Sequence, residues 1–276
     1  MKFGFSTGSI AQGDFERGLK IASTGETKAI ELSALRESEL SPVLKWIDGL
    51  GDRLASFEHI SFHAPSRRVD LSELEFVSKL KPIADRGWAI IVHPDAIEDF
   101  SCWKSLGRAV CIENMDKRKR IGRTAAHLEW IFERLPDATF CFDIGHAKQV
   151  DPSMQEAEKF LRIFSDRLRQ VHMSYVNSSC RHERLNRESM LAFSRLSHWF
   201  ADSTAVILET PVSESEVAEE IEKSTHIFRS RLVDGFFELP MNDECGVDEP
   251  SAPRLDISLP DNAQQKLWSV CNAAFS

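Results

Sequence analysis

The sequence predicts one α/β domain, a (β/α)8 TIM barrel, followed by a C-terminal extension. Short apolar, β-branched or aromatic runs alternate with longer amphipathic stretches, as in repeated strand and helix units around a parallel sheet. Eight such runs occur, and 276 residues suit one barrel, which typically needs about 250. We therefore assign residues 1–233 to the barrel and residues 234–276 to the extension.

The predicted strands are the eight apolar runs, in chain order Lys2–Ser6, Ala29–Ser33, His59–His63, Trp88–His93, Ala109–Glu113, Thr139–Asp143, Gln170–His172 and Ala205–Glu209. The amphipathic stretches between them predict helices that include Leu71–Lys81, Thr124–Arg134, Gln155–Arg167 and Arg187–Phe200, and Glu214–Arg231 closes the last unit. The residues after Val233 are acidic and rich in proline, with too little apolar material for a core. We expect this extension to be partly flexible.

Composition narrows the classes of function. The chain has 34 basic and 43 acidic residues, a net charge of −9, which disfavours nonspecific attraction to nucleic acid or anionic lipid. No run approaches the roughly 20 apolar residues of a membrane span, and no signal-peptide core precedes the first strand. The six cysteines are scattered without CxxC pairing, which is typical of reduced thiols. These features predict a cytoplasmic protein that has no membrane partner.

The third to eighth predicted strands each end in a side chain of a metal-binding type. The endings read SFHAP, IVHPD, CIENM, FDIGHA, VHMS and ILETP. Because the carboxyl ends of parallel barrel strands share one rim, we expect the side chains at these ends to converge, namely His63, His93, Glu113, Asp143, His172 and Glu209. His146 and His182 follow shortly after two of the strands, and Glu31 lies near the end of another.

A histidine at one strand end is more often a hydrogen-bonding or capping residue than a metal ligand. Here, however, five of the nine histidines lie at or just after strand ends, whereas His59, His127, His198 and His226 lie elsewhere. A buried group of carboxylates and imidazoles without a cation would leave uncompensated charge. The joint pattern therefore predicts a bound divalent metal.

These ordered motifs resemble those of the endonuclease IV-like branch of the xylose isomerase-like TIM barrels, from about Phe3 to Val212. The resemblance implies up to three divalent ions, usually zinc, with manganese as the alternative. It implies that the ions are held by three ligand sets: His63, His93 and Glu113; Glu113, Asp143, His172 and Glu209; and His146 with His182.

The third set departs from the family pattern. The family has an acidic ligand two residues before the last histidine, whereas this chain has Cys180, Arg181 and His182. A thiolate is a competent zinc ligand, so Cys180 is a candidate third-site ligand, with a free thiol as the equal alternative. The tyrosine that often follows the HAP motif is replaced by Ser66, and no DNA-reading loop is recognisable.

The first functional hypothesis is a metal-dependent hydrolase that cleaves a phosphoester in a small phosphorylated or sugar-like substrate through metal-activated water. By resemblance, Glu113 bridges two metals and Glu209 lies near the attacking water. The arginines near the motifs are candidates to bind phosphate oxygens, with solvated surface residues as the alternative: Arg67, Arg68, Arg181 and Arg184.

The second hypothesis is a sugar or sugar-phosphate isomerase or epimerase. Such relatives resemble this chain only at Glu113, Asp143, His172 and Glu209, which hold one metal while the two glutamates move protons beside the substrate carbonyl. A third hypothesis, an AP endonuclease that acts on DNA, is less favoured because of the charge and the missing loops. A noncatalytic barrel is disfavoured because the second ligand set is intact. The sequence does not indicate the oligomeric state.

Overall fold

The computed structural model describes residues 1–229, and the predicted boundary at Val233 and the C-terminal extension lie outside the described residues. Within this range, eight parallel strands close into a barrel in the order β1-β10-β7-β6-β5-β4-β3-β2. Their bounds are β1 (Lys2–Ser6), β2 (Ala29–Ser33), β3 (His59–His63), β4 (Ala89–Val92), β5 (Val110–Glu113), β6 (Thr139–Asp143), β7 (Leu168–Met173) and β10 (Ala205–Leu208). The predicted barrel is therefore confirmed.

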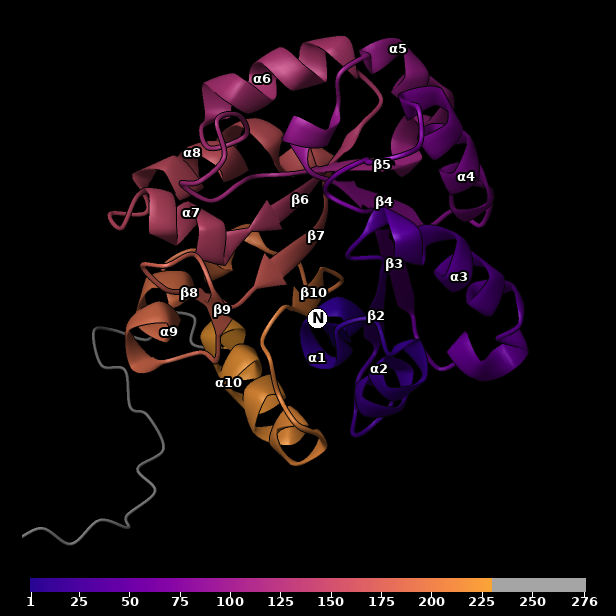
Figure 1. The fold of residues 1–276 in the computed structure, drawn as a ribbon. Helices are drawn as coiled ribbons and strands as arrows, with labels where there is room; N and C mark the ends of the chain where they lie inside the picture. Colours follow the sequence, from indigo (N-terminus) through magenta and orange to yellow (C-terminus); the bar gives the residue numbers. More distant parts are fainter. Residues whose placement is uncertain (230–276) are drawn as a thin grey trace, which may run out of the picture. The chain divides into compact units, whose positions relative to one another are not determined.

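The helices surround the strands, as Figure 1 shows. The α-helices are α1 (Thr7–Ala11), α2 (Phe15–Ala22), α3 (Glu37–Asp48), α4 (Glu73–Asp85), α5 (Phe100–Trp103), α6 (Ala125–Arg134), α7 (Ile144–Val150), α8 (Gln155–Phe164), α9 (Arg187–Ser194) and α10 (Val217–Arg229). Short 3-10 turns are η1 (Gly51–Leu54), η2 (Pro94–Ala96), η3 (Lys104–Ala109), η4 (Ser165–Arg167), η5 (Ser197–Trp199) and η6 (Glu214–Glu216).

Several predicted bounds differ from the observed ones. The helix predicted to end at Lys81 continues through Pro82 to Asp85. Proline removes one backbone hydrogen bond, but Ile83 beyond it is fully buried, and this packing continues the helix. Strand β7 is longer than predicted, and an antiparallel hairpin of β8 (Tyr175–Val176) and β9 (His182–Glu183) follows it. The sequence did not predict this hairpin, because each strand has only two residues.

The barrel interior is narrow and partly polar. Successive side chains of a strand point to opposite faces of the sheet. Large apolar residues such as Phe62 and Phe140 therefore point outward to the helices, where they are fully buried. The inward positions carry small residues and the predicted metal ligands. At Gly4 the neighbouring strand leaves no room for a side chain, because a Cβ placed there would lie 1.6 Å from the carbonyl oxygen of Ala29.

Hydrogen bonds cross this interior between strands that are not neighbours. Gln170 on β7 donates to Glu31 on β2 at 2.8 Å, and its amide oxygen lies 2.9 Å from His59 on β3. Both Glu31 and Gln170 are fully buried. These three side chains therefore form a hydrogen-bond network across the barrel interior.

Candidate metal centre

The strand ends bring imidazole and carboxylate groups into overlapping clusters, and in each cluster the candidate ligand atoms all lie within 4.8 Å of one another. Among the described residues there are four such groups: His63, His93 and Glu113; Glu113, Asp143, His172 and Glu209; Asp143, His146 and His182; and Glu31, His63 and Glu209. Side chains from seven strands or the segments that follow them thus meet in one region. The predicted convergence is what the barrel topology produces.

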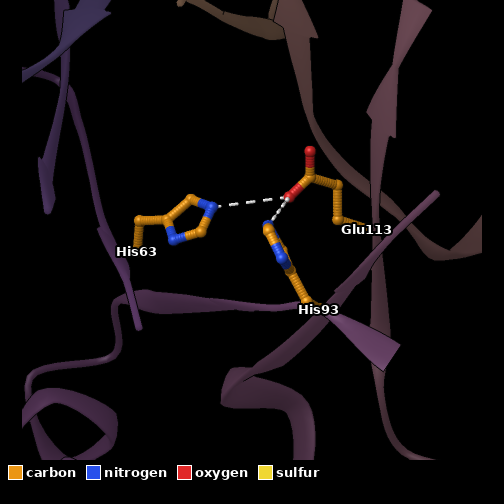
Figure 2. A group of neighbouring side chains, drawn as sticks. All are labelled: His63, His93 and Glu113. Carbon is orange, nitrogen blue, oxygen red and sulfur yellow. Dashed lines mark ion pairs between the residues drawn. The ribbon is translucent and has the colours of Figure 1, made fainter. Parts of the chain in front are cut away.

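The first cluster centres on Glu113 at the end of β5. Figure 2 shows the rings of His63 and His93 directed toward the same carboxylate oxygen. Oε2 of Glu113 lies 3.5 Å from Nε2 of His63 and 3.3 Å from Nε2 of His93. The Nδ1 of His63 is held by the carbonyl oxygen of Ala64 at 2.9 Å, which leaves Nε2 free to act as a ligand.

The second cluster shares Glu113 with the first. Nδ1 of His172 lies 3.4 Å from Oε1 of Glu113 and 3.5 Å from Oε1 of Glu209. Asp143, the last residue of β6, is held in place by Asn114, which donates to its carbonyl oxygen and accepts from its backbone N–H, both at 2.8 Å. This asparagine was not among the predicted site residues, although it lies within the CIENM motif.

The third cluster lies where α7 meets the β8–β9 hairpin. His146 and His182 have ring centroids 5.3 Å apart, and Nδ1 of His146 lies 3.2 Å from Asp143. The structure does not bring Cys180 into this cluster. Its Sγ accepts from the amide of Gln149 at 2.8 Å, and Asp143 supplies the acidic group next to the two histidines.

Two features of these clusters fit a divalent cation. Oε2 of Glu113 and Oδ2 of Asp143 are buried and have no hydrogen-bond partner among the described residues. A buried carboxylate oxygen without a hydrogen bond is costly, and bound divalent cations would offset this cost at both oxygens. Imidazole nitrogens with carboxylate oxygens are a ligand set that suits zinc or manganese.

The electrostatics show how closely the groups interact. Burial raises the pKa of Asp143 to about 6, although His146 opposes this. Burial lowers the pKa of His146, but the charges of Asp143 and Glu113 outweigh this and raise the pKa to about 10. The pKa of His182 falls to about 4 because of burial and the neighbouring His146. Such perturbed values in one cluster are typical of functional sites.

A cavity of about 540 Å³ lies above the clusters. The predicted residues that line it are His63, His93, Glu113, His146, His182 and Glu209, and Ser66 lines it too. The rest of the lining includes residues that sequence reasoning missed, chiefly Ser6, Ser9, Gln12, Ser33, Arg36, Asp116, Arg118 and Lys119. The run DKRKRIGR, which contains the last three, was the signal that could have identified this basic loop.

The four arginines predicted to bind phosphate do not line this cavity. Arg68 forms ion pairs with Glu73 and Glu98, and Arg184 forms ion pairs with Glu216, Glu219 and Glu220. Arg67 and Arg181 are exposed. Their proximity to the motifs in sequence did not place their side chains at the site: Arg68 and Arg184 are held by acidic side chains outside the cavity, and neighbouring residues such as Ser66 and His182 line it instead.

Comparison with protein-family models gives no match, and no curated protein matches the sequence. Among solved structures, the chain is similar to a xylose isomerase domain protein from Planctomyces limnophilus, with 14% identity and a TM-score of 0.54 over 82% of this chain and 96% of that one. This similarity shows a shared barrel fold.

Two further solved structures share this fold. The 3-keto-D-glucoside 4-epimerase YcjR from E. coli is 13% identical, with a TM-score of 0.53 over 82% of this chain and 98% of that one. The probable 3-DHS dehydratase AsbF from Bacillus anthracis is 11% identical, with a TM-score of 0.52 over 84% of this chain and all (100%) of that one. The (β/α)8 barrel fold that the resemblance implied is thus confirmed. No helix in the described part of the chain is long and apolar enough to cross a membrane.

Proposed function

We propose that the protein is a divalent-metal-dependent isomerase or epimerase that acts on a small sugar-like substrate. The observation that carries the proposal is the group of Glu113, Asp143, His172 and Glu209, whose ligand atoms converge beneath a cavity large enough for a small molecule. The names of two structural neighbours, a xylose isomerase domain protein and a keto-glucoside epimerase, agree with this class. An isomerase or epimerase was the second hypothesis from the sequence, and the structural neighbours support it more than they support the hydrolase.

The two glutamates suit proton transfer at a carbon next to a carbonyl group. Both line the cavity, and both approach the same nitrogen of His172, so a substrate held there would lie within reach of both carboxylates. Glu209 and Glu113 are the groups proposed to move the proton: one carboxylate takes it from the carbon, and that proton, or one exchanged with solvent, is returned to the neighbouring carbon or to the opposite face. A bound divalent cation would polarise the carbonyl oxygen and so make the carbon acidic.

The rest of the lining suits a ligand rich in hydroxyl groups. Ser6, Ser9, Gln12 and Ser33 offer neutral donors and acceptors on the wall formed by β1, α1 and β2. Across the cavity lies the basic loop of residues 117–123, where Arg118 is paired with Asp116 and Lys119 with Asp95. We propose that this loop binds an anionic group, such as a sugar phosphate, when one is present.

A hydrolase remains the second candidate because of His63 and His93. Isomerase chemistry at one metal does not require these residues as ligands, yet both approach Glu113 closely. Two or three metals per chain would favour phosphoester cleavage, and about one would favour isomerisation.

The deciding experiment measures both metal content and reaction type. The purified protein, loaded with zinc or manganese, would be incubated in D2O with aldoses, ketoses and their phosphates, and followed by NMR and phosphate release. We expect deuterium incorporation next to the carbonyl group, loss of it in Glu209→Gln, and its retention in His127→Ala. Phosphate release without deuterium incorporation, from a protein that binds two or more metals, would overturn the proposal in favour of the hydrolase.

A further inference from the structure

Glu31, in the middle of β2, is in contact with His172 from the far side of the barrel interior. Oε2 of Glu31 lies 2.9 Å from Nε2 of His172, and both side chains have an exposed fraction of 0%. The same oxygen accepts from Gln170 at 2.8 Å and from Ser61 at 3.2 Å. Three polar groups from two other strands therefore converge on one carboxylate oxygen.

The contact places a proton on Nε2 of His172. If Nε2 were unprotonated, its lone pair would face a buried carboxylate oxygen at 2.9 Å, which is repulsive. Nε2 of Gln170 also lies 2.9 Å from Nε2 of His172, but two N–H groups cannot bond to each other, so Glu31 is their common acceptor. The amide oxygen of Gln170 is occupied by His59, which fixes the orientation of the amide.

His172 is therefore arranged differently from the other histidines of the site. In His63 and His146, a backbone carbonyl oxygen holds Nδ1, at 2.9 and 3.0 Å respectively. In His172, by contrast, Glu31 holds Nε2, and Nδ1 faces Glu113 and Glu209.

We infer that Glu31 is a positioning residue that holds the Nε2–H of His172, fixes its ring and presents Nδ1 to the metal. This inference rests on the proposed role of His172 as a metal ligand. A carboxylate behind a ligand histidine fixes the tautomer and increases the basicity of the ligand nitrogen, and its loss typically weakens metal binding about 10–100-fold. The alternative is that Glu31 is itself a ligand, since it also groups with His63 and Glu209.

The first test measures the protonation of the two ring nitrogens of His172 by long-range proton–nitrogen correlation NMR of the wild-type protein. The His172 signals are assigned by their absence in His172→Gln. In metal-free protein we expect a protonated Nε2, whose proton signal shifts in Glu31→Gln. In zinc-loaded protein we expect zinc on Nδ1. An unprotonated Nε2, or zinc on Nε2, overturns the inference. Because the metal-free measurement does not require bound zinc, it still decides the inference if the proposed metal function fails.

The second test measures zinc affinity by competition with a chelating dye and zinc content by elemental analysis. Glu31→Gln should bind the same number of ions as the wild type, about 10–100-fold more weakly. Ser61→Ala is the matched control, because it removes another donor to the same oxygen but keeps the contact with His172, and its affinity should change much less. Loss of one ion per chain in Glu31→Gln would overturn the positioning role and identify Glu31 as a ligand.

Discussion

The side-chain amide of Gln149 lies 2.8 Å from the Sγ of Cys180, and it also donates to the carbonyl oxygen of Asn177 at 2.9 Å. These two bonds tie helix α7, which carries His146, to the hairpin that carries His182. The backbone of Cys180 adopts the left-handed conformation, with φ of 57°, which a residue with a side chain adopts only where its surroundings hold it. The thiol thus contributes to the join between two segments of the site.

The first prediction concerns this thiol. Because Sγ faces Gln149 rather than the clusters, Cys180→Ala should keep the metal content of the wild type and lose a little stability. Elemental analysis and thermal unfolding would measure the two quantities. Loss of about one ion per chain in Cys180→Ala would instead support the thiolate ligand considered from sequence.

The second prediction concerns Glu113 and Asp143, each of which has a buried carboxylate oxygen without a hydrogen-bond partner among the described residues. Glu113→Gln and Asp143→Asn each remove a negative charge that a divalent cation requires, so both should lower metal content and abolish activity. His127→Ala is the control, since His127 lies on helix α6 outside every cluster. Full metal occupancy in the two carboxamide variants would show that the assigned ligands are wrong.

The third prediction concerns removal of the metal. A cation that binds only the folded protein stabilises it by about 2.7 kcal/mol at 100 times its Kd, which corresponds to roughly 5–10 °C in Tm for a domain of this size. Chelation should therefore lower the Tm of the native protein by this order, as scanning fluorimetry would show. Glu113→Gln should show a smaller shift. Equal Tm values for the native protein with and without chelator would contradict a metal held in these clusters.

The fourth prediction concerns Gly145, which lies between Asp143 and His146. A Cβ at this position would lie 2.5 Å from the backbone oxygen of Ser174, so Gly145→Ala must displace α7 or the segment that follows β7. We expect a loss of about 1–3 kcal/mol in the free energy of unfolding, together with weaker metal binding. Gly49→Ala is a suitable control, because its Cβ would meet its nearest neighbour at an ordinary 3.4 Å. Equal stability of the two variants would disprove the close approach.

The fifth prediction separates two arginines. Arg184 pairs with the fully buried Glu220, so Arg184→Ala should destabilise the fold, by about 1–2 kcal/mol because the arginine is partly exposed. Its effect on the KM for a phosphorylated substrate should be small. Arg118→Ala, at the cavity, should raise that KM, and it should also lower the Tm because it removes the partner of the buried Asp116. A raised KM in Arg184→Ala and an unchanged KM in Arg118→Ala would restore Arg184 as a phosphate-binding residue.

The sequence by itself determined the barrel and most of its ligand candidates. Apolar runs of strand length that end in histidine or a carboxylate are local patterns, and parallel strands must place their carboxyl ends on one rim. His63, Glu113 and Glu209 could therefore be placed together although they are far apart in the chain. The strand bounds of β1, β2, β3 and β6 were predicted to the residue.

The tertiary structure alone decided which side chains beyond the strand ends face the site. Arg184 and Arg118 both lie in basic runs after a motif, and nothing local distinguishes the arginine that pairs with a helix from the one that lines the cavity. Glu31 and His172 are 141 residues apart, and their contact exists only because β2 and β7 face each other across a closed barrel. Such contacts depend on closure of the whole sheet, which no window of sequence encodes, so the network behind the metal ligands could be recognised only in three dimensions.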